Sequence, residues 1–235
     1  MFFAGFSYAS RYCPTCRALP SDIAVKCATC GDGGFVYPVN QDGRIDYSIT
    51  IPCPRCNAQW LAVSSRLPAA SRQYQRLATW QERKDTTEGF QAAKDFVAGT
   101  IHPPLLLIYG NPGTGKSHLA KAIGWHFVDA GHAVLYFQVE SLMDALRRDM
   151  GDDNHESRLA DRVMRIPLLI LDDLGAHQKT EWATVQLDRI INHRWESNMA
   201  TVATANDPEL QPRVLDRFRD GRLARMRGES FRGQK

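Results

Sequence analysis

The sequence predicts an α/β fold with a parallel sheet flanked by helices, preceded by a small cysteine-rich module. From residue 105 onward, apolar runs of strand length alternate with helical segments. Near-continuous apolar runs are typical of parallel strands that are buried on both faces. All six cysteines lie between Cys13 and Cys56, which sets the first part of the chain apart. A chain of 235 residues has room for one sizeable domain and a small module.

The sheet and its helices are expected within residues 101–235, the larger predicted domain. Strands are predicted over residues 105–109, 133–137, 168–171 and 201–204. Helices are predicted over residues 116–130, 141–149, 156–165 and 180–197. The polar residues 61–100 predict a linker helix and then the first helix of the domain. The expected packing face of that helix is Ala92, Ala93, Phe96 and Val97.

Residues 1–60 predict a zinc-binding module that resembles a zinc ribbon. The cysteines form three C-x₂-C pairs, and in a reducing compartment such pairs bind metal more often than they form disulfides. A structural Zn²⁺ takes four ligands. The favoured set is Cys27, Cys30, Cys53 and Cys56. A hairpin of strands over residues 35–37 and 45–49 would bring these two pairs together. Cys13 and Cys16 would replace one pair or take part in a second site, and a redox role for one pair is the rival interpretation.

Composition narrows the classes of function. A net charge of +3 does not indicate a strong global attraction to nucleic acid, although local basic patches are compatible with it. The apolar start of the chain is too short for a signal peptide, and no other run is long enough to cross a bilayer. We therefore expect a cytoplasmic protein without a membrane partner.

Residues 110–117 carry a nucleotide-binding motif. They fit the pattern G-x-x-x-x-G-K-[ST] and lie between a predicted strand and a predicted helix. The glycines let backbone N–H groups surround a phosphate chain, and the helix N-terminus adds its positive dipole end. Lys116 would reach the β- and γ-phosphates, and the Ser117 hydroxyl would bind Mg²⁺. The residues expected to bind ATP are Gly110, Asn111, Pro112, Gly113, Thr114, Gly115, Lys116, Ser117 and His118.

Polar residues at two further strand ends extend this prediction. Asp172 would hold Mg²⁺ through its water shell, and Asp173 would polarise the attacking water or cap the following turn. Many ATPases carry Glu at the second position, so the shorter Asp predicts slow or regulated hydrolysis. Asn206 would touch the γ-phosphate or orient the water, or it would cap a turn or helix. The arginines of residues 213–219 would stabilise the γ-phosphate or form a solvated helix face.

Four stretches together resemble the DnaC/DnaI-type replicative helicase loaders and the related IstB transposition helper ATPases of the AAA+ class. They are residues 110–120, 168–175, 204–206 and 213–218, and their order and spacing match over about residues 75–235. The resemblance implies an AAA+ P-loop ATPase fold over residues 101–235. Because the chain ends soon after these stretches, only a reduced lid is expected.

The resemblance also implies roles for individual residues. Asn206 would be the first sensor, Arg232 the second sensor, and Arg217 an arginine finger that acts on ATP held by a neighbouring subunit. Residues 141–165 would form a helical insertion that touches single-stranded DNA. Its basic candidates are Arg147, Arg148 and Arg158. A solvated helix face is the other interpretation of these arginines.

The function implied is an ATPase that loads a hexameric replicative DNA helicase onto single-stranded DNA. Its subunits would associate head to tail, with ATP, Mg²⁺ and Zn²⁺ as cofactors, and residues 1–60 would grip the helicase. One alternative is an IstB-like transposition helper that acts on target DNA, although such helpers usually lack a zinc module. Another is a zinc-bearing adaptor that binds nucleotide without turnover, which Asp173 leaves open.

Overall fold

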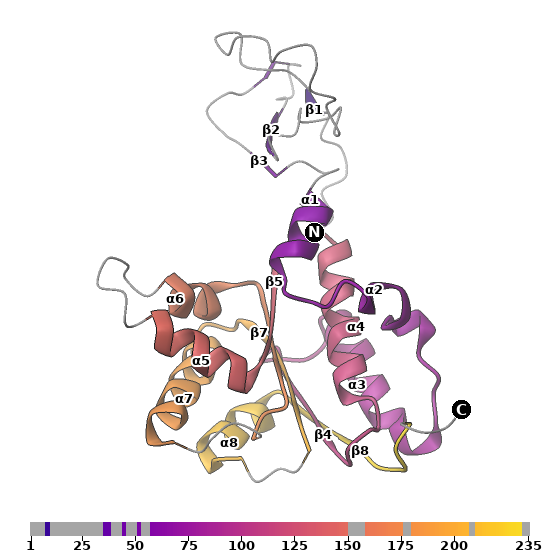
Figure 1. Cartoon of the computed structure of the whole chain (residues 1–235). Coiled ribbons are helices and arrows are strands. Elements are labelled where there is room, and N and C mark those ends of the chain that lie inside the picture. Colours follow the sequence, from indigo (N-terminus) through magenta and orange to yellow (C-terminus); the bar gives the residue numbers. More distant parts are fainter. Residues whose placement is uncertain are drawn as a thin grey trace. The chain divides into compact units, whose positions relative to one another are not determined.

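Two compact units make up the chain, Met1–Leu61 and Ala62–Lys235 (Figure 1). The computed structural model describes residues 8–9, 35–38, 44–45, 51–52, 57–149, 158–175, 180–206 and 210–231. All six cysteines lie outside these ranges, so the zinc-ribbon module stays a prediction. No helix within the ranges combines the length and the apolar character that a membrane span requires.

The described part of the first unit is a small antiparallel sheet. Its strands are β1 (Tyr8–Ala9), β2 (Phe35–Pro38) and β3 (Ile51–Pro52), in that order across the sheet. Strand β2 confirms the prediction for residues 35–37. Strand β2 pairs with β3, with Val36 opposite Ile51. Residues 46–49 lie outside the described residues, so the pairing of residues 45–49 with β2 stays a prediction.

The second unit contains a five-stranded sheet in which all strands are parallel. Its strands are β4 (Leu105–Gly110), β5 (Val134–Gln138), β6 (Leu168–Asp172), β7 (Ala200–Ala205) and β8 (Arg222–Met226). They follow the order β5-β6-β7-β4-β8 across the sheet. The first four confirm the sequence prediction. The edge strand β8 was not expected, because its Arg-Leu-Ala-Arg-Met sequence forms no apolar run and its pairing with β4 is a tertiary contact.

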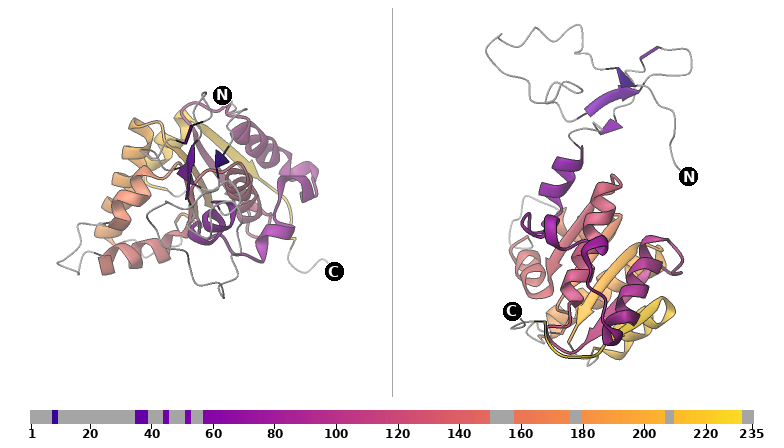
Figure 2. Two further views of the ribbon diagram at one scale, coloured as in Figure 1. Left: turned by 90° about the horizontal axis from the view of Figure 1, so that it is seen from above. Right: turned by 90° about the vertical axis from the view of Figure 1, so that its right-hand side faces the viewer.

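Helices cover both faces of this sheet (Figures 1 and 2). On one face lie α3 (Thr87–Val97) and α4 (Lys116–Asp129). On the other lie α5 (Val139–Asp149), α6 (Arg158–Arg165), α7 (Glu181–Glu196) and α8 (Pro212–Asp220). Successive side chains along a strand point to opposite faces of the sheet, so each strand can pack against both layers of helices. Leu105 and Leu107 of β4 join the core cluster with α5–α8, while Leu106 and Ile108 point to the opposite face, and all four are fully buried.

The segment before the sheet differs from the linker helix that the sequence predicted. Helix α1 (Asn57–Ser64) is followed by α2 (Ser71–Tyr74) and by two single-turn 3₁₀ helices, Leu77–Thr79 and Lys84–Thr86. The threonine that ends each 3₁₀ turn accepts a backbone N–H bond with its own side chain, which favours a turn over a continuing helix. The expected first helix is α3, and Ala92, Ala93 and Phe96 are buried as predicted.

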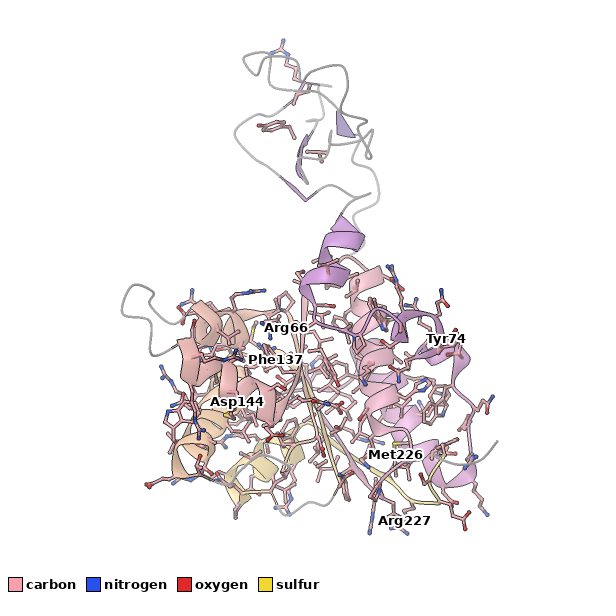
Figure 3. All side chains as sticks on the ribbon, in the orientation of Figure 1. Arg66, Tyr74, Phe137, Asp144, Met226 and Arg227 are labelled. Carbon is pink, nitrogen blue, oxygen red and sulfur yellow. The ribbon has the colours of Figure 1, made fainter. Side chains whose placement is uncertain are left out.

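Side chains fill the space between sheet and helices (Figure 3). Just after α1, the Arg66 guanidinium lies 4.4 Å from the ring centre of Phe137 on β5 (Figure 3). The strand order then decides where the polar residues meet. Because β6, β7 and β4 are neighbours and parallel, their carboxyl ends lie side by side at one edge of the sheet, which is where open α/β sheets bind ligands.

Candidate nucleotide-binding site

The loop between β4 and α4 takes a conformation that only glycine accommodates at both glycines of the G-x-x-x-x-G pattern. Gly110 has a φ of 133°, and a Cβ there would collide with the carbonyl oxygen of Met226. Gly115 has a φ of 95° and begins α4, and a Cβ there would come within 2.5 Å of Cη2 of Trp80. Positive φ is costly for residues with a Cβ. The glycine spacing of the motif is therefore a requirement of this backbone path.

The segment after β8 is hydrogen bonded to the same loop. The backbone N–H of Asn111 donates to Met226 O at 3.2 Å, and its side-chain Nδ2 donates to Gly228 O at 3.2 Å. The N–H of Phe231 donates to Gly113 O at 2.9 Å. Residues 226–231 thus hold the outer side of the loop.

Lys116 lies inside the loop. Its side chain is buried, and Nζ donates to the carbonyl oxygens of Gly110 at 2.9 Å and Asn111 at 2.6 Å. Thr114, which is also buried, donates its hydroxyl to Asn111 O at 2.9 Å. Two backbone carbonyl oxygens of the loop therefore hold the ammonium group within it.

Three hydroxyl groups orient the carboxylate of Asp172 at the end of β6. Ser117 Oγ donates to Oδ1 at 2.7 Å, and Thr204 Oγ1 donates to the same oxygen at 2.5 Å. Tyr136 Oη donates to Oδ2 at 2.5 Å. Burial, followed by the negative charge of Asp172, raises the pKa of Tyr136 well above its ordinary value, so the phenol remains a donor. The neighbouring Ser117 hydroxyl and Asp172 carboxylate are hard oxygen ligands and fit Mg²⁺.

Asp173 is held in a left-handed backbone conformation, with a φ of 62°. Its N–H donates to Thr204 Oγ1 at 2.9 Å, and its Oδ1 accepts a hydrogen bond from Asn206 Nδ2 at 3.2 Å. Left-handed geometry is uncommon outside glycine and is tolerated best by Asp and Asn. The two side chains that the sequence analysis chose as candidates for water activation are therefore partners of each other.

These groups surround one cavity of about 440 Å³. It is lined by Gln75, Pro112, Gly113, Gly115, Lys116, Ser117, His118, Lys121, Gln138, Asp172, Asp173, Thr204 and Asn206. The cavity thus joins the phosphate loop, the acidic pair and Asn206. Such an arrangement can bind a nucleotide phosphate chain together with a divalent cation.

One side of the site holds polar atoms that are buried without a hydrogen-bond partner among the described residues. They are Oε1 of Gln75, Nε1 of Trp80 and Nε2 of His118. The His118 ring packs edge-on against Trp80, with ring centres 5.1 Å apart. Burial lowers the pKa of His118, which keeps the imidazole neutral near pH 7. Unpaired buried polar atoms are costly, and a bound ligand is one way to satisfy them.

Several predicted residues lie elsewhere. Arg217 does not line this cavity; it lies on α8 and lines a second cavity of about 620 Å³. Although larger, the second cavity lacks the phosphate loop and the acidic pair. On α5, Arg147 donates to Thr180 Oγ1 at 3.1 Å and lies over Trp182, while Arg148 donates to Asp144 O at 3.2 Å. Arg232 and the side chain of Arg158 lie outside the described residues.

Sequence reasoning missed several residues of the site, including Thr204, Tyr136, Gln75 and Trp80. Thr204 belongs to the motif from which Asn206 was selected. Its hydrogen bonds to both Asp172 and Asp173 are possible because β7 lies beside β6. Tyr136 lies within a predicted strand, and only its register opposite Ile170 brings the phenol toward Asp172. Gln75 and Trp80 belong to the polar segment read as a linker. No signal in that segment would have identified these two.

Comparisons with known proteins agree with this geometry. A family model described as "IstB-like ATP binding protein" matches residues 95–232, more than half of the chain. The replicative helicase loader DnaC of Buchnera aphidicola subsp. Baizongia pistaciae is 32% identical over 120 residues, which cover 48% of this chain and 49% of that protein. A putative insertion sequence ATP-binding protein of Sinorhizobium fredii is 37% identical over 103 residues, covering 44% and 34%. The chain thus spans about half the length, or less, of these relatives.

Two solved structures share the fold. The crystal structure of the DnaC helicase loader superposes with a TM-score of 0.58 at 22% identity, covering 68% of this chain and all of that one. The AMPPCP-bound DnaA of Aquifex aeolicus superposes with a TM-score of 0.61 at 19% identity, covering 70% and 52%. Both likenesses concern the fold, a parallel sheet flanked by helices. By its phosphate loop, its sheet and the match over residues 95–232, the chain belongs to the family of IstB-like ATP-binding proteins.

Proposed function

We propose that this chain is an ATPase that loads a hexameric replicative DNA helicase onto single-stranded DNA in the cytoplasm. The observation that carries the proposal is the gathering of the phosphate loop, Asp172 and Asn206 around one cavity, in a chain whose ATPase region is 32% identical to a protein named helicase loader. A loader must hold its cargo and then release it. A site that senses the γ-phosphate provides such a two-state control.

Each residue of the site would have a separate role in ATP hydrolysis. Lys116 would contact the β- and γ-phosphates, while Ser117 and Asp172 would hold Mg²⁺, which neutralises phosphate charge. Asp173 would polarise the attacking water, and Asn206 would orient the carboxylate and sense the γ-phosphate; the 3.2 Å hydrogen bond between them supports this. Because the Asp side chain is short, turnover would be slow and would depend on partners.

Arg217 would act on the ATP of a neighbouring copy of the chain. Its position away from the phosphate loop of its own chain supports a role in trans, within a head-to-tail assembly. An arginine finger stabilises charge on the transferred phosphoryl group in the transition state. Arg232 would serve as the second sensor.

Residues 1–60 would bind Zn²⁺ and grip the helicase. Cys27, Cys30, Cys53 and Cys56 are the proposed ligands, and Cys13 and Cys16 would complete or extend the site. Four thiolates suit a structural Zn²⁺, which contributes folding energy and takes no part in catalysis. Because so short a module has little apolar surface to bury, we expect its fold to depend on the metal.

Single-stranded DNA would contact α5 and α6 through Arg147, Arg148 and Arg158. The first two are exposed, which supports this assignment. Two or three cations per subunit give weak binding, so appreciable affinity would arise from several subunits on one strand.

The test is capture of the full-length protein by the immobilised replicative helicase of the source organism, with ATP and Mg²⁺ present. We expect capture by the wild type and loss of capture by a Cys27→Ser/Cys30→Ser variant whose zinc content has fallen. A Lys116→Ala variant separates the two parts, because it should keep its zinc and lose nucleotide binding. Nucleotide binding by the cysteine variant shows that its ATPase domain is still folded.

Two results would contradict the proposal. A wild-type protein that binds nucleotide but not the helicase is not a loader. A protein that binds helicase and nucleotide but hydrolyses no ATP, even with single-stranded DNA added, is a zinc-bearing adaptor and not an ATPase.

An IstB-like transposition helper is the second candidate, favoured by the 37% identity to an insertion sequence ATP-binding protein. It would share the nucleotide chemistry and differ in its DNA substrate. Competition between duplex and single-stranded DNA of equal length separates the two functions. Preference for duplex, together with failure to capture the helicase, would support the transposition helper.

A further inference from the structure

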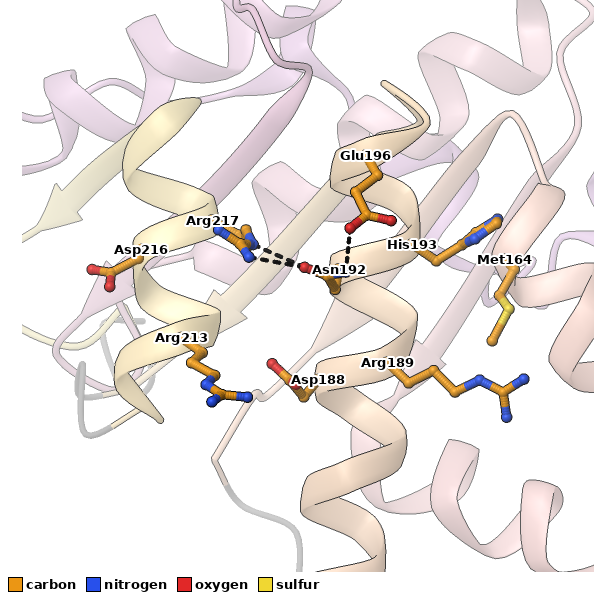
Figure 4. Close-up of a pocket in the computed structure, with 9 residues that line it drawn as sticks. All are labelled: Met164, Asp188, Arg189, Asn192, His193, Glu196, Arg213, Asp216 and Arg217. Atoms are coloured by element: carbon orange, nitrogen blue, oxygen red, sulfur yellow. Dashed lines mark hydrogen bonds between the residues drawn. The ribbon is translucent and has the colours of Figure 1, made fainter.

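The cavity between α7 and α8 holds the Arg217 side chain in a defined orientation (Figure 4). Both Nε and Nη2 of Arg217 donate to Oδ1 of Asn192, at 3.1 and 3.0 Å. The guanidinium carbon also lies 3.9 Å from the ring centre of Trp195. Asn192 and Trp195 stand three residues apart on α7, so they present one helix face to the same guanidinium.

The amide of Asn192 is itself oriented by a neighbour. Its Nδ2 donates to Oε1 of Glu196 at 2.8 Å, one helical turn further on (Figure 4). With the nitrogen committed to a carboxylate, the amide oxygen faces Arg217. Glu196 therefore acts on the arginine only through Asn192.

The helices that carry these residues are anchored in the core. Phe218 and Val214 of α8 and Ile191 of α7 are at most 1% exposed. The base of the Arg217 side chain therefore has little freedom, and the orientation of its tip is set by Asn192 and Trp195.

The chemistry of the contact leaves the arginine competent to bind an anion. A guanidinium has five N–H groups, and Asn192 takes one on Nε and one on Nη2. One N–H group on Nη1 and one on Nη2 remain free to donate to two phosphate oxygens, which is bidentate binding. A neutral amide oxygen also orients the group without cancelling its charge, and among the ion pairs of the described residues none includes Arg217.

We propose that Asn192 and Trp195 are positioning residues for Arg217. Asn192 holds its Nε–Nη2 edge and Trp195 packs against the guanidinium, so that its Nη1–Nη2 edge meets the γ-phosphate of ATP on a neighbouring copy of the chain. The inference rests on the proposed action of Arg217 in trans. It adds that the orientation is set within the subunit that donates the arginine, before the neighbour's ATP arrives. Such preorganisation raises the rate of the chemical step without tightening nucleotide binding.

The test mixes two defective full-length proteins in the presence of single-stranded DNA. A donor carrying Lys116→Ala cannot use its own ATP site but keeps Arg217, and an acceptor carrying Arg217→Ala keeps the ATP site. The acceptor alone should lose on the order of 10³-fold in kcat, the lower end of what an arginine finger contributes, and the donor alone should hydrolyse almost no ATP because it no longer binds the nucleotide. Hydrolysis should return in the mixture, because donor arginines then face intact acceptor sites.

The Asn192→Ala change is then placed in one partner at a time. In the donor it should lower kcat of the mixture roughly ten- to a hundredfold at unchanged KM, as expected for a misplaced catalytic group. Asn192→Asp in the donor should lower kcat further, because a carboxylate would pair with the guanidinium and compete with phosphate. The same changes in the acceptor should have no effect, and Val185→Asp on the exposed side of α7 controls for added charge.

Each remaining outcome overturns a specific statement. A mixture as inactive as its two components would refute the action of Arg217 in trans, and the positioning role with it. If hydrolysis returns in the mixture and its kcat is unchanged by Asn192→Ala in the donor, the positioning role alone is refuted. Equal losses from donor and acceptor would show that Asn192 only supports the fold, which thermal unfolding of each variant would detect independently.

Discussion

Tyr136 on β5 donates a hydrogen bond of 2.5 Å to the carboxylate of Asp172, at the end of the neighbouring strand β6. The phenol is buried, and its raised pKa keeps it protonated throughout the physiological range. A strand that supplies no residue to the phosphate loop thus orients the carboxylate expected to hold Mg²⁺. Partners of this kind influence a metal site by fixing its ligands.

Changing Tyr136 to Phe should weaken Mg²⁺-dependent nucleotide binding while leaving the fold intact. Loss of one of three hydroxyl donors frees the Asp172 carboxylate to rotate, and loss of such a partner typically costs about tenfold or more in metal affinity. Titration of Mg²⁺ against binding of a fluorescent ATP analogue measures the effect. Tyr74→Phe is the matched control, because Tyr74 is 70% exposed. Equal Mg²⁺ dependence in the two variants would contradict this role.

Thr204 should be more sensitive, since its hydroxyl joins both acidic residues. It donates to Asp172 at 2.5 Å and accepts from the N–H of Asp173 at 2.9 Å. Thr204→Val keeps the shape and removes both bonds, so we expect ATP turnover to fall roughly ten- to a hundredfold. Thr204→Ser keeps the hydroxyl and should retain most of the activity. A serine variant as impaired as the valine variant would mean that the methyl group, and not the hydrogen bonds, matters.

Arg194 should be a determinant of stability and not of activity. Its guanidinium is fully buried on α7, and burial lowers its pKa to about 9, so it remains charged at neutral pH. It donates to the carbonyl oxygens of Val163, Met164, Ile166 and Ala200 and to the hydroxyl of Thr201. Arg194→Met would leave these acceptors unpaired and should cost about 3 kcal/mol or more of unfolding free energy. Urea unfolding measures this cost.

The exposed Arg189 on the same helix provides the control for that experiment. Arg189→Met should change the unfolding free energy by less than about 0.5 kcal/mol, as is usual for surface positions. Similar values for both variants would show that the carbonyl oxygens around Arg194 find other partners.

The neutral state of His118 predicts a loss of stability on acidification. Its pKa is lowered from 6.5 by burial in the folded state, so below about pH 6.5 the unfolded chain binds more protons than the folded one. The free energy of unfolding contributed by this group therefore falls as the pH falls through that range. Thermal unfolding between pH 7.5 and 5.5 should show a smaller decrease in Tm for His118→Gln than for the wild type. The exposed His132→Gln is the control, and identical pH profiles of wild type and His118→Gln would refute the prediction.

Much of the architecture was predictable because its signals are local. The four strands β4 to β7 are apolar runs, and the loop before Lys116 needs glycines wherever its backbone enters positive φ. The edge strand β8 was missed for a physical reason. Its residues Arg222 and Arg225 face solvent, so its identity as a strand depends on hydrogen bonds to β4 and not on its own pattern.

Some residues of the candidate site could likewise be predicted from the sequence, and others could not. Lys116, Ser117, Asp172, Asp173 and Asn206 were selected from motifs, and the structure brings all five to one cavity. Tyr136 and Thr204 were not selected, because a hydroxyl beside a carboxylate is invisible until strand order and register are known.

By itself the sequence determined the alternation of strands and helices, the phosphate loop and the acidic strand end, because each of these features depends on residues that are close together along the chain. Only the tertiary structure decided that Thr204 and Tyr136 orient Asp172, and that Asn192 holds Arg217. These contacts join residues 25 to 36 positions apart. The packing of β5, β6 and β7, and of α7 against α8, creates them, and no local propensity encodes such packing.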